Sequence, residues 1–142
     1  MLKHIPKNLS PELLKILCEM GHGDEIVLAD ANFPSASIAK RLVRADGIPA
    51  GELLQAILTL MPLDQYDSEN FLLMEKCAGD PADTSVWEEY QTILHAAEPQ
   101  AKAAFLERFA FYNRARQAYA VVATGETRQY ANIILKKGCV LE

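Results

Sequence analysis

The sequence is poor in the features that mark disulfide-bonded, secreted or membrane-spanning proteins. Its 142 residues include only three cysteines, Cys18, Cys77 and Cys139, with no C-x-x-C pair. Because these cysteines are odd in number and widely spaced, they predict neither a disulfide framework nor a thiolate metal site. We expect the three cysteines to be small buried hydrophobic residues. No stretch approaches the roughly 18–20 apolar residues of a membrane span, and residues 1–9 lack the apolar core of a signal peptide. We therefore predict a cytoplasmic protein with no membrane partner.

Positive charge is also scarce. Nineteen acidic residues outnumber 14 Lys and Arg residues, which gives a formal net charge of −5. The basic residues are spread along the chain rather than clustered, so no patch for a polyanion is evident. Nucleic acid is not a predicted partner.

Several catalytic and cofactor-binding motifs are missing. The three histidines, His4, His22 and His95, have neither H-x-x-x-H nor H-x-H spacing, so no zinc site is predicted. The sequence G-H-G-D around His22 matches neither the phosphate loop nor the dinucleotide-binding fingerprint. No serine lies in a G-x-S-x-G elbow. We therefore expect no metal and no nucleotide cofactor.

What the chain does contain is a regular alternation of helical and strand patterns. Half of its residues are apolar, enough to fill the core of one domain over residues 1–142. The fold class that we predict is α/β, a single three-layer domain with a mostly parallel sheet of about six strands covered by helices. Helices are expected over 11–21, 49–60, 85–97 and from 108, with a loop or short helix over 34–40, and strands over 26–29, 41–43, 71–75, 103–106, 119–124 and 132–135.

Local signals support several of these boundaries. Ser10 followed by proline predicts an N-cap and a first helical position. Gly21 is expected to end that helix in the left-handed conformation. Ser85 and Glu88 suggest a capping box, and the pair Asp46-Gly47 is typical of a turn.

The stretch over residues 20–34 organises the chain. His22 lies between two glycines, an apolar run follows, and Asp30 comes at the carboxyl end of the predicted strand. Ligands of open α/β sheets bind at that edge. A strand of about six residues spans roughly 17–20 Å, so His22 and Asp30 of one chain are not expected to reach one small ligand unless loops fold back. A C-cap role for His22 and a simple turn at Asp30 remain alternative interpretations.

Seven segments together carry a resemblance to a known family. They are M-G-H-G-D-E from residue 20, D-A-N-F-P from 30, R-A-D-G from 44, L-D-Q-Y from 63, R-F-A-F-Y from 108, T-G-E from 124 and Y-A-N-I-I-L-K-K-G from 130. In this order, over nearly the whole chain, they resemble the L-fucose mutarotase family, which is related to D-ribose pyranase.

The resemblance implies an enzyme that equilibrates the α and β anomers of L-fucose, and also pyranose and furanose forms of related sugars, without metal or organic cofactor. It implies a homo-oligomer, usually a decamer of two pentamers, with sites at subunit interfaces. At such an interface, a neighbouring subunit could supply the residue that one chain cannot bring to the ligand.

By position, His22 resembles the family's proton donor. A histidine, with an ordinary pKa near 6.5, can exchange protons with a sugar at neutral pH. One departure is Asn32, where some relatives have histidine, so the preferred sugar stays open. The resemblance assigns sugar binding to Asp30, Arg108, Tyr130 and Asn132, and secondarily to Tyr112 and Asp64.

Each of these residues also has a purely structural interpretation; Arg108, for example, could pair with Glu107 or Glu126. Two other functions remain open. A non-catalytic sugar-binding module would need most of the same groups. A magnesium-dependent phosphotransferase with Asp30 as nucleophile is less well supported, because Asn32 stands where a second aspartate is expected.

Overall fold

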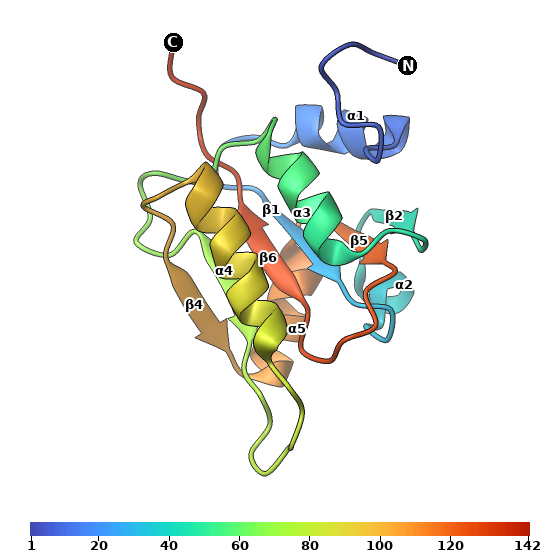
Figure 1. Ribbon diagram of the computed structural model, residues 1–142, viewed down its shortest axis with the longest axis vertical. Helices are drawn as coiled ribbons and strands as arrows, with labels where there is room; N and C mark the ends of the chain where they lie inside the picture. The colour runs from blue at the N-terminus through green and yellow to red at the C-terminus, as the bar shows by residue number, and fades with distance from the viewer.

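The computed structural model describes residues 1–142, which form one six-stranded sheet with helices on both faces (Figure 1). The strand order is β2-β5-β1-β6-β3-β4. The strands are β1 (Glu25–Ala29), β2 (Leu42–Ala45), β3 (Phe71–Met74), β4 (Ala103–Leu106), β5 (Ala120–Thr124) and β6 (Ile133–Lys136). The helices are α1 (Pro11–Glu19), α2 (Ser35–Ile38), α3 (Ala50–Leu58), α4 (Ser85–Ala97) and α5 (Arg108–Gln117).

All strands but one run in the same direction. β5 is parallel to β1 and β2, and β4 is parallel to β3, whereas β6 is antiparallel to both of its neighbours, β1 and β3. The predicted α/β class and mostly parallel sheet of about six strands are therefore confirmed. The reversed direction of β6 places the residues before it at the edge where the other strands end.

The core is divided into two apolar layers by the sheet. Ile26 and Leu28 of β1 point into the larger layer, which α1, α3 and α4 cover, whereas Val27 and Ala29 point into the smaller layer under α2 and α5. A strand buried on both faces needs a continuous apolar run, because successive side chains point to opposite faces. This explains the sequence pattern of β1.

Two predictions about α1 have different outcomes. Ser10 is the N-cap, since its Oγ accepts a hydrogen bond from the N–H of Leu13 at 3.1 Å. The prediction for Gly21 is wrong, because the helix already ends at Glu19 and the C-cap Met20 is extended. The left-handed residue in this turn is Gly23, with φ of 87°, a conformation that glycine adopts without steric cost.

Two other local predictions are also wrong. Thr84, not Ser85, is the N-cap of α4, and Ser85 already lies within the helix and hydrogen-bonds to Asp83. The capping box fails because the carboxylate of Asp83 accepts both the N–H and the hydroxyl of Ser85. The cysteines are not buried: Cys18 and Cys77 are exposed and Cys139 is partly exposed, since none of them lies on an inward-facing side of a helix or strand.

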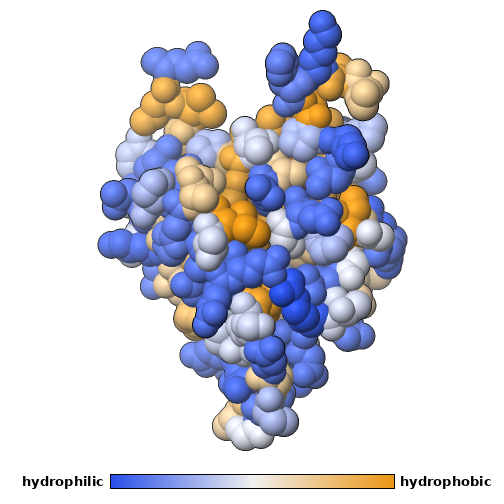
Figure 2. All heavy atoms as spheres, in the orientation of Figure 1, coloured by the Kyte–Doolittle hydropathy of each residue, from blue (hydrophilic) through white to orange (hydrophobic).

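The molecular surface shown in Figure 2 is mainly hydrophilic, with small separate apolar patches and apolar side chains on the two projecting ends of the chain. None of the helices combines the length and apolar character needed to cross a membrane. Buried polar residues lie beside strand ends, at the two opposite edges of the sheet, and include Asp30, Asp64, Asn70, Glu126 and Asn132.

Candidate functional site

A small cavity lies at the carboxyl edge of the parallel strands. Its volume is about 190 Å³, smaller than the clefts of roughly 300–1,000 Å³ that hold drug-sized ligands. Five of the predicted sugar-binding residues line it. They are Asp30, Arg108, Tyr112, Tyr130 and Asn132, and the other lining residues are Asn32, Phe33, Met74, Cys77 and Gln129.

Asp30 and Asn132 form the buried base of this cavity. The N–H of Asp30 donates to Oδ1 of Asn132 at 2.8 Å, and Oδ1 of Asp30 accepts from the N–H of Asn32 at 3.0 Å. Burial raises the pKa of Asp30, and hydrogen bonds from Asn32, Phe33 and Asn132 only partly oppose this effect. Further hydrogen-bond donors, such as the hydroxyl groups of a ligand, would stabilise the ionised form of this buried carboxylate.

Arg108 and Tyr112 come from the first turns of α5, which begins directly after the end of β4. Nε of Arg108 donates to the hydroxyl oxygen of Tyr112 at 3.2 Å. The Tyr112 ring also meets Phe33 edge to face, with ring centroids 5.4 Å apart. Neither Glu107 nor Glu126 pairs with Arg108, because Glu107 caps α5 and Glu126 binds Arg128. The exposed guanidinium keeps donors available for a ligand.

Tyr130 has a left-handed backbone, with φ of 56°, which is uncommon for a residue other than glycine. Its hydroxyl donates to Oδ2 of Asp80 at 2.6 Å and accepts from the N–H of Cys77 at 3.2 Å. The bond to Asp80 is the main effect that raises the pKa of Tyr130 to about 12. Nε1 of Trp87 donates to the Tyr130 carbonyl at 2.8 Å. The hydroxyl group of Tyr130 therefore already has a hydrogen-bond donor and an acceptor within the chain, and the residue lines the cavity.

Asp80 and Trp87 are thus site-supporting residues that the sequence analysis missed. Trp87 lies in α4 and Asp80 in the loop before it, and the sequence analysis assigned neither residue to the site. No local signal distinguishes these roles, because both residues contact a turn more than 40 positions further along the chain.

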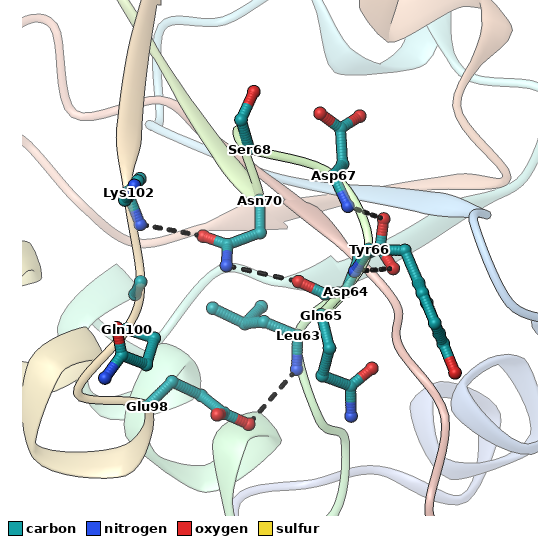
Figure 3. Close-up of a pocket in the computed structure, with 11 residues that line it drawn as sticks. Leu63, Asp64, Gln65, Tyr66, Asp67, Ser68, Asn70, Glu98, Gln100 and Lys102 are labelled. Atoms are coloured by element: carbon teal, nitrogen blue, oxygen red, sulfur yellow. Dashed lines mark hydrogen bonds between the residues drawn. The ribbon is translucent and has the colours of Figure 1, made fainter.

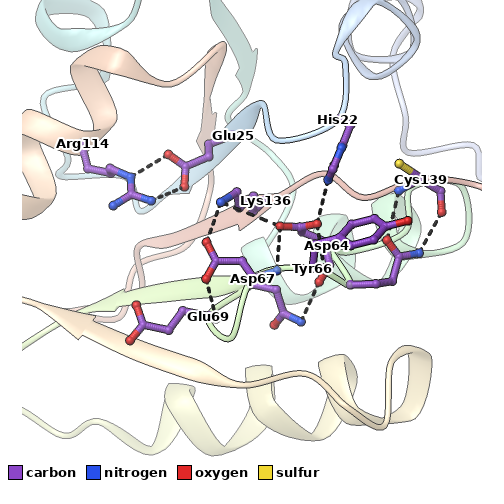
Figure 4. Close-up of polar contacts among 11 residues, drawn as sticks. His22, Glu25, Asp64, Tyr66, Asp67, Glu69, Arg114, Lys136 and Cys139 are labelled. Carbon is purple, nitrogen blue, oxygen red and sulfur yellow. Dashed lines mark hydrogen bonds and ion pairs between the residues drawn. The ribbon is translucent and has the colours of Figure 1, made fainter.

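His22 lies at the other edge of the sheet, beside Asp64 (Figure 4). Nε2 of His22 is 2.9 Å from Oδ1 of Asp64. The His22 side chain is 46% exposed and that of Asp64 only 3%. The Tyr66 ring lies 5.3 Å from the His22 ring, between centroids. The depression around them is open and polar, with Lys136 at its side.

The Asp64 carboxylate is well supplied with donors (Figures 3 and 4). Oδ1 accepts from the N–H of Tyr66 and Oδ2 from the N–H of Asp67, each at 3.2 Å. Burial opposes ionisation, but His22 and these two N–H groups outweigh it, so the pKa of Asp64 lies below its usual value. Asp64 is therefore ionised at neutral pH.

The predicted residues consequently form two separate groups, which share no lining residue. His22 precedes β1 and Asp30 follows it, and a strand of five or six residues is roughly 17–20 Å long. The loops do not fold back to bring them together. Asp64 lies with His22 rather than with the cavity residues. The His, Cys, Asp and Glu side chains form no group of three or more that could hold a metal ion.

Comparisons with known proteins find relatives along nearly the whole chain. The chain is 52% identical to an L-fucose mutarotase of Histophilus somni over 97% of its own length and 96% of that protein. It is 54% identical, with a TM-score of 0.93, to the crystal structure of a fucose mutarotase from Streptococcus pneumoniae in complex with L-fucose, covering 99% and 100% of the two chains.

A more distant likeness, at 25% identity and a TM-score of 0.75, covers 99% of this chain and 100% of Bacillus subtilis RbsD complexed with D-ribose. The family model described as the RbsD / FucU transport protein family matches residues 3–140. This match spans nearly all of the sequence, including both polar edges of the sheet, so the chain belongs to the RbsD / FucU family.

Proposed function

We propose that this protein is an isomerase that interconverts the α and β anomers of L-fucose. The observation that carries the proposal is the identity of about half of all residues to fucose mutarotases along nearly the entire chain. The cavity at the carboxyl edge supports it, because its carboxylate, amide, guanidinium and phenol groups suit a small polyhydroxy ligand.

Mutarotation requires two proton transfers. The ring oxygen gains a proton while the anomeric hydroxyl loses one, so the ring opens to an aldehyde and then closes on either face. We assign this acid–base role to His22, which is half-exposed and oriented by a carboxylate. Asp30 would accept hydrogen bonds from sugar hydroxyls, and Asn132 and Arg108 would donate hydrogen bonds to them. The Tyr112 hydroxyl would donate or accept, while Tyr130 would contact the sugar through its ring and backbone.

One chain does not hold a complete site of this kind. We therefore propose that two subunits share each site, with His22 from one subunit facing the cavity of its neighbour. The decamer suggested by the family resemblance would provide such interfaces. Light scattering is expected to give a mass far above the monomer mass of 15.8 kDa. A stable, fully active monomer would contradict the shared site.

The activity is tested by saturation-transfer NMR of the anomeric protons of L-fucose. Adding the protein should accelerate exchange between the anomers, and chelator should not change the rate. D-Ribose serves as the comparison sugar for the open question of specificity. Binding of L-fucose without faster exchange would instead support the non-catalytic sugar-binding module.

The shared site is tested by mixing two inactive variants, His22→Ala and Asp30→Ala. If each site takes these residues from different subunits, oligomers assembled at random from equal amounts regain about a quarter of the parent activity. If one subunit supplies both residues, the mixed oligomers stay inactive. Each variant alone is the control.

Two broader expectations accompany this function. We propose that residues 1–142 act as a single domain, so limited proteolysis of the folded protein should yield no smaller stable core. The cytoplasmic location also stays a prediction, and fractionation of the source cells tests it.

A further inference from the structure

We propose that Asp80 is a positioning residue of the sugar site: it accepts a hydrogen bond from the Tyr130 hydroxyl group and so holds Tyr130 at the cavity. This inference rests on the proposed function and extends it to a residue outside the cavity lining. Because Asp80 does not line the cavity, it acts on the sugar only through Tyr130.

Tyr130 has a backbone conformation that needs support from its surroundings. Its φ of 56° lies in the left-handed region, which residues with a side chain seldom adopt. Nε1 of Trp87 donates to its carbonyl oxygen at 2.8 Å, its hydroxyl group donates to Oδ2 of Asp80 at 2.6 Å, and the N–H of Cys77 donates to that hydroxyl at 3.2 Å. All of these partners precede Tyr130 by more than 40 positions, so the tertiary structure supplies the support.

Asp80 lies in the loop between β3 and α4, which projects from the body of the molecule (Figure 1). Both hydrogen bonds that join residues 76–82 to the rest of the chain end on the Tyr130 hydroxyl group. Within the loop, Oδ1 of Asp80 accepts from the N–H of Ala82 at 2.9 Å, and the N–H of Asp80 donates to the carbonyl of Cys77 at 3.1 Å. One carboxylate oxygen therefore binds the loop and the other binds Tyr130.

The protonation of the pair determines the direction of its hydrogen bond. The hydroxyl group of Tyr130 is the main contact that lowers the pKa of Asp80, so Asp80 is ionised at neutral pH. The same bond raises the pKa of Tyr130 to about 12, because a phenolate would lose this bond and face a negative charge. An ionised carboxylate only accepts hydrogen bonds, so Asp80 fixes both the oxygen and the hydrogen of the phenol.

A shift of Tyr130 would disturb the cavity in two places. Tyr130 and Cys77 both line it, so the loss of their contact would alter its wall. Asn132 follows two positions later, and its Oδ1 accepts from the N–H of Asp30 at 2.8 Å. Asp80 therefore contributes to sugar affinity and not to proton transfer, because the proposed acid–base group lies at the opposite edge of the sheet.

The first test is Asp80→Asn, which keeps the size of the side chain. An amide replaces one accepting oxygen by an NH₂ donor, so it cannot keep the bonds to both Tyr130 and Ala82. The dissociation constant of L-fucose, measured by calorimetry, should rise roughly tenfold, which corresponds to about 1.4 kcal/mol. The exchange rate at saturating L-fucose should change less than about twofold. The matched control is Asp83→Asn in the same loop, because the Asp83 carboxylate hydrogen-bonds only to Ser85, and it should keep the parent affinity.

The second test is a double-mutant cycle between Asp80 and Tyr130. Tyr130→Phe keeps the ring but lacks the hydroxyl group, so it removes the bond from the other side. If Asp80 acts only through Tyr130, Asp80→Asn should have no further effect on the affinity in the Tyr130→Phe background. Dissociation constants that rise by independent factors would overturn the proposal.

The third test follows the ionisation of Tyr130 directly. The protein is labelled with ¹³C at the ζ carbon of its five tyrosines, and Tyr130→Phe identifies the Tyr130 signal. In the parent, Tyr130 should stay protonated at about pH 11, whereas in Asp80→Asn it should titrate close to the ordinary value of about 10. A merely structural role of Asp80 would lower the melting temperature without moving this titration.

These experiments separate the two proposals. A parent protein that neither binds L-fucose nor accelerates its anomeric exchange would refute the proposed function, while the titration would still decide whether Asp80 holds Tyr130. Parent affinity in folded Asp80→Asn, or a parent Tyr130 that ionises at about pH 10, would overturn the positioning role. If Asp80→Asn does not fold, the titration of the parent decides alone.

Discussion

At the scale of single residues, two buried aspartates show how surroundings determine chemistry. Asp30 and Asp64 are both almost inaccessible. Burial raises the pKa of Asp30, whereas hydrogen bonds from His22 and two backbone N–H groups bring the pKa of Asp64 below its usual value. Asp64 has the donors that it needs, while Asp30 lines a cavity that a ligand can fill. The contacts of Asp64 are thus made within the chain, whereas the Asp30 carboxylate lies at the cavity.

Replacing Asp30 by asparagine should therefore make the unliganded fold more stable and binding weaker. Because the folded pKa of Asp30 is raised, its ionisation costs stability above the folded pKa, and this cost disappears as the pH falls below the unfolded value near 4. Asp30→Asn should have a higher melting temperature than the parent at pH 7 but not near pH 3. Loss of a charged hydrogen bond should weaken L-fucose binding by about 1.5–3 kcal/mol.

Calorimetric melting curves at the two pH values and titration with L-fucose measure these effects. A lower melting temperature of Asp30→Asn at pH 7 would indicate that the ionised carboxylate supports the fold instead.

His22→Ala should separate catalysis from stability. Loss of a general acid–base lowers rates by roughly 10²–10⁴-fold, so anomeric exchange per folded molecule should fall by this amount. L-Fucose should still bind through the other cluster. The exchange rate is measured by NMR and the binding by calorimetry. If His22 only supported the turn after α1, stability would fall by about 1 kcal/mol, as for helix caps, and exchange would be unchanged.

At the scale of elements, close approach between loops sets the geometry of both sheet edges. Gly125 follows β5, and its N–H donates to the carbonyl of Ile48 at 2.8 Å. A Cβ on Gly125 would overlap the carbonyl oxygen of Asp46. At the opposite edge, a Cβ on Gly138 would overlap the carbonyl of Leu63, next to Asp64. The glycines of the T-G-E and K-K-G segments are therefore explained by packing.

Gly125→Ala should destabilise the protein, because a backbone carbonyl cannot move aside as a flexible side chain can. Overpacking of this kind costs about 1–3 kcal/mol. Gly47→Ala is the matched control in the neighbouring loop, since a Cβ there meets nothing within 4 Å. It should be neutral or stabilise by up to about 1 kcal/mol. Urea unfolding of both variants measures the difference, and equal stabilities would refute the packing argument.

At the scale of the whole molecule, the sheet separates the residues that we propose to bind the sugar from the proposed acid–base group. The carboxyl edge holds the cavity, while the opposite edge holds His22, Asp64 and Lys136. Carboxylates that accept hydrogen bonds from charged side chains or backbone N–H groups stabilise loops at both edges of the sheet. Glu126, for example, forms two hydrogen bonds with the Arg128 guanidinium, at 2.8 and 2.9 Å, which lower its pKa.

Acid should consequently destabilise the whole fold. The pKa values of Asp64 and Glu126 are lowered on folding, so their contribution is fully present above the unfolded values near 4 and is lost as the pH falls through the folded values. The melting temperature should change little from about pH 5 to 7 and should decrease below about pH 4. Scanning calorimetry across this range checks the profile, and a melting temperature that rises on acidification would contradict it.

Sequence patterns predicted much of the fold because they report local physics. Continuous apolar runs identified strands such as β1, and Ser10-Pro11 identified the start of α1. The strand over residues 103–106 forms although two of its four residues are alanine, a poor strand former, because its backbone pairs with β3. The Ser85 cap and the Gly21 turn were wrong because neighbouring residues, Asp83 and Gly23, satisfy the same backbone requirements.

The sequence by itself determined the α/β class, the family resemblance and the placement of His22 and Asp30 at opposite ends of one strand. These properties depend on residues close together along the chain. Only the tertiary structure decided that Asn132, which precedes a strand, meets Asp30, which follows one, because β6 runs antiparallel to β1. It also decided that Asp64 pairs with His22 across 42 positions. Strand order and direction determine such contacts, and no local propensity encodes them.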